Sequence, residues 1–121
     1  MAIIVVIEDE PVLRLTFRHI LEAEGHEVWE ADNGRTGLAL CRSKRPDLVI
    51  TDLIMPELTG AEAVTILDRE LPNTPVIAMS GMESDVPEEI AERTARFRFV
   101  LKPVKPQTLR TLVGTMLAPG A

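Results

Sequence analysis

Short apolar runs alternate with amphipathic stretches along the whole chain. Residues 3–7 are all β-branched, which is typical of a central strand covered on both faces. A polar segment follows, and apolar side chains then recur at helical spacing. The same alternation continues to the end of the chain and predicts five strands and five helices. The predicted strands are Ile3–Ile7, His26–Ala31, Leu48–Thr51, Pro75–Met79 and Phe97–Leu101.

Prolines and glycines mark the ends of the predicted helices. Pro11 lies where the first helical turn tolerates a proline, and Gly25 closes the helix that follows. The pair Asn33-Gly34 predicts a turn, and Pro46 stops the next helix. The first helix therefore begins near Pro11, and the others cover Thr36–Arg45, Gly60–Glu70, Pro87–Ala95 and Pro106–Leu117.

This alternation predicts an α/β fold, a doubly wound parallel sheet with helices on both faces and right-handed crossovers. The strand at residues 26–31 is the least apolar, so we expect it towards an edge of the sheet. A chain of 121 residues without repeats or linkers suits one domain, residues 1–121, with residues 118–121 as a tail.

Composition excludes several classes of function. The net charge of −6 and the 3% aromatic content argue against direct nucleic-acid binding, which needs a basic face or stacking side chains. Cys41 is the only cysteine, so the chain has no internal disulfide. No apolar run approaches a membrane span, and the first residues lack the pattern of a signal peptide. We therefore expect a cytoplasmic protein with no membrane contact.

Polar residues follow the predicted strands where functional groups gather in parallel sheets. Glu8 and Asp9 follow the first strand, Asp52 the third, Ser80 the fourth and Lys102 the fifth. The carboxyl ends of parallel strands meet at one edge, so we expect these side chains to lie close together. Clustered carboxylates need a cation, and oxygen ligands favour Mg²⁺ or Mn²⁺. A carboxylate in that setting can accept a phosphoryl group, with a lysine and a hydroxyl stabilising its oxygens.

Each of these residues also has a structural explanation. Asp52 can cap a loop, and Glu8 and Asp9 can cap the helix that starts near residue 11. Ser80 can be a turn residue, and Lys102 can be a solvated surface lysine. Because all of them occupy strand ends in order, their combination favours a phosphoryl acceptor over separate structural roles.

The residues around these positions resemble one family over the whole chain, the receiver domains of two-component response regulators. Residues 3–11 resemble its opening strand and acidic pair. Residues 52–60 fit its Asp-x-x-Met-Pro-x-x-x-Gly signature without a gap. Residues 76–81 resemble the strand that ends in a switch hydroxyl, and Lys102-Pro103 resembles the family's Lys-Pro pair.

The resemblance implies a flavodoxin-like, five-stranded sheet in the order 2-1-3-4-5. It implies that Asp52 is the phosphoacceptor. Glu8, Asp9 and Asp52, with the backbone carbonyl of Ile54, would hold Mg²⁺. Ser80 and Lys102 would bind phosphoryl oxygens.

The resemblance also implies a switch. Phe99 would turn inward when Ser80 moves toward the phosphoryl group. It further suggests a cis peptide bond before Pro103. We hypothesise that apolar Ile54 and Met82, which flank the site, restrict attacking water and lengthen the phosphorylated lifetime.

Three positions depart from the family pattern. Glu8 stands where aspartate is commoner, so its metal contact is expected to be rearranged or water-mediated. Gly81 replaces the usual alanine after the hydroxyl and is expected to loosen the switch loop. Phe99 lacks a tyrosine hydroxyl, so its inward burial needs no hydrogen-bond partner.

The resemblance implies a sensor histidine kinase or phosphotransfer protein as phosphoryl donor. It implies a downstream protein, or a second copy of the chain, as partner of the face formed by the fourth helix, the fifth strand and the last helix. The chain would catalyse only its own phosphorylation and dephosphorylation. Three alternatives stay open: an unphosphorylated docking module, an aspartyl-phosphate phosphatase, which normally has a second acid where Ile54 stands, and a flavin-binding domain, which needs more aromatic residues.

Overall fold

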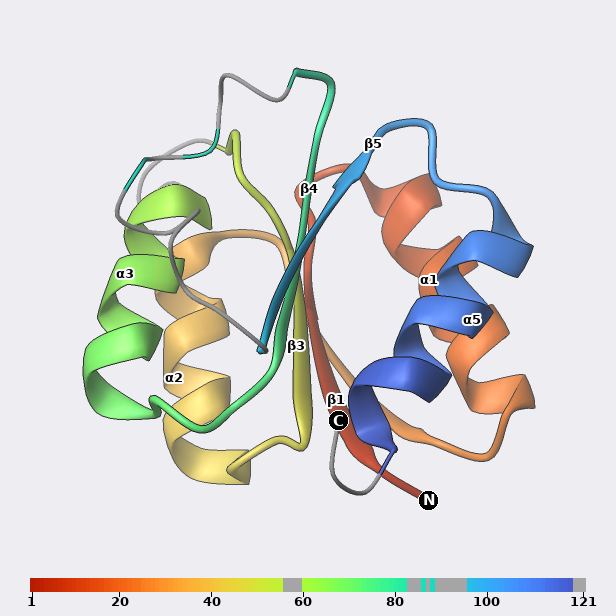
Figure 1. Ribbon diagram of the computed structural model, residues 1–121, viewed down its shortest axis with the longest axis horizontal. Coiled ribbons are helices and arrows are strands. Elements are labelled where there is room, and N and C mark those ends of the chain that lie inside the picture. Colours follow the sequence, from red (N-terminus) through yellow and green to blue (C-terminus); the bar gives the residue numbers. More distant parts are fainter. Residues whose placement is uncertain (56–59, 83–85, 87, 89–95, 119–121) are drawn as a thin grey trace.

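A five-stranded parallel sheet runs through the middle of the molecule in the computed structural model, which describes residues 1–55, 60–82, 86, 88 and 96–118 (Figure 1). The strand order β2-β1-β3-β4-β5 confirms the expected doubly wound topology and places β2 at an edge. The strands are β1 (Ile3–Ile7), β2 (Glu27–Ala31), β3 (Leu48–Asp52), β4 (Val76–Ser80) and β5 (Phe97–Leu101).

Helices cover both faces of the sheet (Figure 1). α2 and α3 lie on one face, and α1 and α5 on the other. Their bounds are α1 (Pro11–Ala23), α2 (Gly34–Lys44), α3 (Gly60–Glu70) and α5 (Pro106–Leu117). The helix expected at Pro87–Ala95 lies outside the described residues, apart from residue 88. Within the described part of the chain, no helix has the length and apolar character needed to cross a bilayer.

The continuous apolar run of β1 serves two cores at once. Val5 and Ile7 pack in the core under α2 and α3, whereas Ile4 and Val6 pack in the core under α1 and α5. Successive side chains of a strand point to opposite faces, so both sets are buried. The end of β1 is therefore held from both sides, which fixes the position of the residue that follows it, Glu8.

The start of α2 differs from the sequence prediction. The helix begins at Gly34, two residues earlier than expected, and Asn33 is its N-cap rather than part of a free turn. The Asn33 side-chain oxygen accepts a hydrogen bond of 2.8 Å from the Thr36 N–H, which satisfies a helical donor. A Cβ on Gly37 would lie 2.6 Å from Ile7 Cγ1, so this glycine lets α2 sit directly on the end of β1.

Candidate functional site

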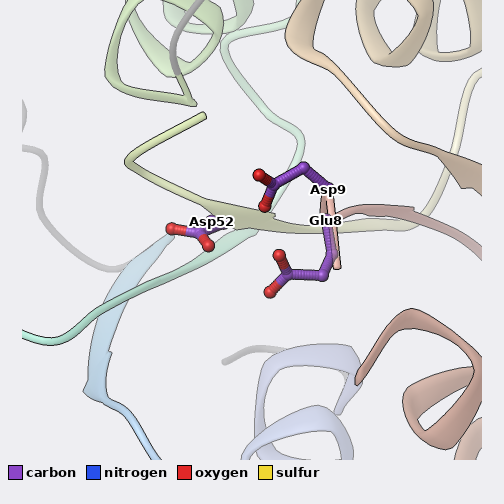
Figure 2. A group of neighbouring side chains, drawn as sticks. All are labelled: Glu8, Asp9 and Asp52. Carbon is purple, nitrogen blue, oxygen red and sulfur yellow. The ribbon is translucent and has the colours of Figure 1, made fainter. Parts of the chain in front are cut away.

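The predicted polar residues meet at one edge of the sheet. Glu8 follows β1, Asp52 ends β3, Ser80 ends β4, and Lys102 follows β5. The residues Glu8, Asp52 and Ser80 are almost fully buried, at 0%, 5% and 2% exposure, whereas Asp9 is exposed. Figure 2 shows the carboxylates of Glu8, Asp9 and Asp52 turned toward a common space. Residues far apart in the sequence thus form one acidic site.

Lys102 lies between two of these carboxylates. Its ammonium donates to Asp52 Oδ2 at 2.5 Å and to Glu8 Oε1 at 2.9 Å. Its backbone N–H donates to the Ser80 carbonyl at 2.8 Å, and the Lys102–Pro103 peptide bond is cis, as expected. The alternative of a solvated surface lysine is wrong, because the Lys102 ammonium donates hydrogen bonds to two buried carboxylates.

The two oxygens of Asp52 are held in different ways. Oδ1 accepts a hydrogen bond of 3.0 Å from the Ile54 N–H, and Oδ2 accepts from Lys102. The Thr51 hydroxyl donates to the Asp52 carbonyl at 2.9 Å. Asp52 therefore does bond to its own loop, as the capping alternative predicts, but its second oxygen faces the site.

Glu8 is fixed by backbone contacts as well as by Lys102. Its N–H donates to the Ala31 carbonyl at 3.0 Å, and its Oε2 accepts from the Glu10 N–H at 3.2 Å. The N-cap of α1 is Glu10, whose side chain makes no capping hydrogen bond. The structural alternative, in which Glu8 or Asp9 caps this helix, is thus wrong for the N-cap position, which Glu10 occupies.

Burial and neighbouring charges shift the acid–base properties of the site. Burial raises the pKa of the Glu8 carboxyl from 4.5 to about 7; hydrogen bonding to Asp9 and the Asp52 charge act in the same direction, and Lys102 opposes them. Partial burial works to lower the pKa of Lys102, but its hydrogen bonds to Asp52 and Glu8 outweigh this and raise that pKa above 10.5. The site therefore holds more negative charge than one ammonium neutralises.

The three carboxylates fit a hard divalent cation. Glu8, Asp9 and Asp52 each offer an oxygen, and the three atoms lie within 4.8 Å of one another. Oxygen ligands without histidine or cysteine suit Mg²⁺ or Mn²⁺. Burial is the main cause of the raised pKa of Glu8, and a cation there would offset the smaller contribution of the Asp52 charge.

The expected switch and tuning residues lie around this site. Phe99 is partly buried on β5, opposite Ala78 of β4, and lines a groove between β5 and α5. Gly81, Ile54 and Met82 are exposed, the last two at 59% and 62%. The switch role of Phe99 and the tuning roles of Ile54 and Met82 stay predictions.

The sequence and the fold both match known proteins. A family model described as "Response regulator receiver domain" matches residues 4–114. The chain is a response-regulator receiver domain. It is 33% identical to Protein PilH of Pseudomonas aeruginosa, covering 98% of this chain and 99% of PilH. The polar-differentiation response regulator DivK of Brucella anthropi is 32% identical, with 90% and 91% covered.

A solved structure supports the same assignment. The chemotaxis protein CheY4 of Vibrio cholerae superposes with a TM-score of 0.83 at 28% identity, covering 97% of this chain and 99% of CheY4. The receiver domain thus has a phosphoacceptor signalling role in a two-component system.

Sequence reasoning missed the contact of Arg14 with the site. Arg14, in the first turns of α1, donates from Nη1 to the Glu8 carbonyl at 2.7 Å. An arginine five residues after the acidic residue Asp9 is a weak signal by itself, because charged residues are common on exposed helix surfaces. Its paired acid, Glu30, lies on another element, and only the fold brings them together.

The raised pKa of Glu8 predicts a pH-dependent stability of the metal-free receiver domain. Between pH 4.5 and about 7 the folded protein keeps a proton on Glu8 that the unfolded chain has lost. The free energy of unfolding should therefore fall as pH rises through this window, by about 3 kcal/mol at most. Glu8→Gln removes this titration, so urea unfolding in EDTA should show a flatter pH profile.

A control variant and a second condition show whether Glu8 is the group that titrates. Glu24→Gln, at the exposed end of α1, should keep the wild-type pH profile. Added Mg²⁺ should restore much of the wild-type stability at about pH 8. An identical pH profile for wild type and Glu8→Gln would show that Glu8 is not the group that titrates.

Proposed function

We propose that Asp52 is the phosphoacceptor of this receiver domain, and that the donor is a phosphohistidine of a sensor histidine kinase or phosphotransfer protein. The observation that carries the proposal is the position of the Asp52 carboxylate, nearly buried at the end of β3, bonded to Lys102 and grouped with Glu8 and Asp9. We propose that the whole of residues 1–121 forms this one domain, with 118–121 as a tail.

The residues that would hold Mg²⁺, or Mn²⁺, are Glu8, Asp9 and Asp52, together with the backbone carbonyl of Ile54. The ion, when bound, supplies positive charge that lowers the cost of bringing an anionic phosphoryl group to an acidic site. Glu8 has one more methylene than the commoner aspartate, so its contact to the ion would be rearranged or would pass through water.

The transfer proposed at Asp52 is a displacement at phosphorus. One Asp52 oxygen attacks, the bond from phosphorus to the histidine nitrogen breaks, and that nitrogen keeps the electron pair and takes a proton. The Lys102 ammonium, already 2.5 Å from Asp52 Oδ2, would donate to a phosphoryl oxygen, as would the Ser80 hydroxyl. The chain would modify only itself, without turnover of other substrates.

The proposed output is a change at the face of β5 and α5, together with the helix that the sequence predicts at Pro87–Ala95. The acyl phosphate carries a charge near −2 where the free Asp52 carboxylate carries −1, and its oxygens would draw Ser80 and Lys102 toward them. Phe99 would then turn inward, and the face would bind a downstream protein or a second copy of the chain. We propose that this takes place in the cytoplasm and without direct contact to nucleic acid, as the acidic charge suggests.

The apolar residues beside the site should slow dephosphorylation. Ile54 and Met82 expose their side chains two residues after Asp52 and Ser80, where they would hinder an attacking water. Replacing both with polar residues, Ile54→Asn and Met82→Gln, should shorten the phosphorylated lifetime several-fold, measured by intact mass after excess donor is removed. Val12→Asn, also exposed and apolar, is the control. An unchanged lifetime in the double variant would rule out the tuning role.

The proposed function is tested by phosphorylation with a small donor. Incubation with acetyl phosphate and Mg²⁺ should add about 80 Da to the intact mass. EDTA should suppress the adduct. A docking module would give no adduct under either condition, and a phosphatase would instead turn over phosphate esters without accumulating one.

A further inference from the structure

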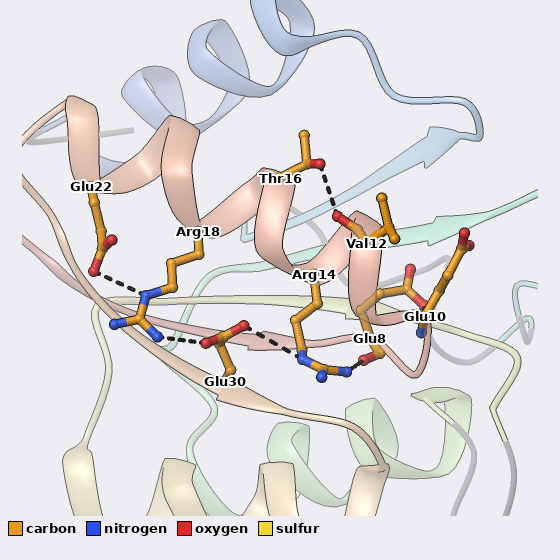
Figure 3. Close-up of polar contacts among 8 residues, drawn as sticks. All are labelled: Glu8, Glu10, Val12, Arg14, Thr16, Arg18, Glu22 and Glu30. Atoms are coloured by element: carbon orange, nitrogen blue, oxygen red, sulfur yellow. Dashed lines mark hydrogen bonds and ion pairs between the residues drawn. The ribbon is translucent and has the colours of Figure 1, made fainter.

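A line of charged side chains runs from α1 to the backbone of the site. Figure 3 shows that ion pairs join Arg14 to Glu30, Glu30 to Arg18, and Arg18 to Glu22. Arg14 Nε lies 3.5 Å from Glu30 Oε1, Arg18 Nη1 lies 2.6 Å from Glu30 Oε2, and Arg18 Nε lies 3.1 Å from Glu22. At one end of this line, Arg14 Nη1 donates to the Glu8 carbonyl at 2.7 Å.

The Glu8 carbonyl needs a donor because the strand ladder ends beside it. The last paired residues of β1 and β2 are Ile7 and Ala31, and the Glu8 N–H still reaches the Ala31 carbonyl. In a continued parallel ladder the next bond would come to the Glu8 carbonyl from residue 33. Asn33 instead caps α2, so the Arg14 guanidinium takes the place of that missing donor.

The hydrogen bond from Arg14 to this carbonyl constrains the positions of two side chains, those of Glu8 and Asp9. The Glu8 carbonyl oxygen lies in the planar peptide unit that joins Glu8 to Asp9. Setting the direction of that plane sets the position of both Cα atoms, and with them the origin of both side chains. Mg²⁺ tolerates little departure from octahedral geometry, so a tilt of this plane would weaken its binding.

Arg14 is itself held in place. Its side chain is only 20% exposed, and the rigid guanidinium contacts Glu30 of β2 and the Glu8 carbonyl at the same time. The Arg18–Glu22 pair is exposed, and exposed ion pairs contribute little to stability. We therefore assign no positioning role to that end of the line. The contact to Glu8 distinguishes Arg14 from Arg18.

We propose that Arg14 is a positioning residue for the metal site, which orients the Glu8–Asp9 peptide through the Glu8 carbonyl while Glu30 holds its guanidinium. This inference rests on the proposed Mg²⁺ site. Arg14 touches neither the ion nor the phosphoryl group, so it acts only through Glu8 and Asp9.

The test compares Arg14→Met with Arg18→Met, which shortens the same line of ion pairs without touching Glu8. Titration calorimetry should show Mg²⁺ binding about tenfold weaker in Arg14→Met, the size usual for residues that orient metal ligands. Arg18→Met should stay within about twofold of wild type. Arg14→Met should also lower the urea midpoint more than Arg18→Met does, because the Glu8 carbonyl loses its donor. Arg14→Lys, which can still donate to the carbonyl, should recover part of the affinity.

A metal-free measurement separates this inference from the metal site itself. In NMR spectra recorded in EDTA, the Asp9 amide belongs to the peptide whose carbonyl Arg14 contacts, so its resonance should move in Arg14→Met and not in Arg18→Met. Absence of Mg²⁺ binding by wild type would overturn the metal site, whatever Arg14 does. Wild-type Mg²⁺ affinity and an unmoved Asp9 resonance in Arg14→Met would overturn the role of Arg14 alone.

Discussion

Replacing Asp52 with asparagine should abolish phosphorylation of the receiver domain. The amide keeps the shape of the side chain and can still accept the Ile54 N–H, so the loop should survive. It has no carboxylate oxygen to attack phosphorus and form an acyl phosphate. Under conditions that label most of the wild-type protein with acetyl phosphate, the variant should show no adduct by intact mass.

Two aspartates provide matched controls for Asp52→Asn. Asp68→Asn, exposed on α3, should be labelled like wild type. Asp9→Asn keeps the acceptor but loses a proposed metal ligand, so its labelling should be slower and need more Mg²⁺. Labelling of Asp52→Asn at the wild-type rate would show that the acceptor lies elsewhere.

Replacing Lys102 with methionine should destabilise the metal-free protein and slow its phosphorylation. Glu8 and Asp52 would lose the ammonium that lies between them, which leaves buried carboxylates without compensation. Such a loss costs about 3 kcal/mol in the free energy of unfolding, somewhat less here because Lys102 is a quarter exposed. Without a donor to the phosphoryl oxygens, the phosphorylation rate should fall about a hundredfold.

The pH and metal dependence of Lys102→Met identify the cause. At about pH 5 Glu8 is protonated in the folded state, so the destabilisation should shrink. Mg²⁺ at about pH 8 should offset it by replacing the lost positive charge. Lys105→Met, at the exposed start of α5, should change neither the urea midpoint nor the rate of labelling. An equal loss of stability at both pH values would contradict the charge explanation.

The parts of the fold that follow from local pattern could be predicted from the sequence. The apolar run of residues 3–7 indicated a strand buried on both faces, and β1 does feed two cores. The lower apolar content of residues 26–31 placed that strand at an edge, where β2 lies. The start of α2 was misjudged because Asn33-Gly34 favours a turn and an N-cap equally well, and only the packing of Gly37 on Ile7 decides between them.

The sequence predicted which residues form the site but not which hydrogen bonds join them. The order of strand ends brought Glu8, Asp52 and Lys102 to one edge, because parallel strands share their carboxyl ends. The ammonium bonds Glu8, 94 residues away, as well as Asp52, and that depends on rotamers and on the buried position of Glu8. The contact of Arg14 with the Glu8 carbonyl depends on where β2 ends, which no local pattern encodes.

The central claim is that the phosphoryl group resides on Asp52, and the most direct test is to locate the acyl phosphate chemically. Borohydride reduces an acyl phosphate to an alcohol and spares free carboxylates, so the acceptor aspartate becomes homoserine. After labelling with acetyl phosphate and Mg²⁺, reduction and peptide mass mapping should find homoserine at position 52 and at no other aspartate. Homoserine at Asp9 or at a surface aspartate, with position 52 unchanged, would contradict the claim.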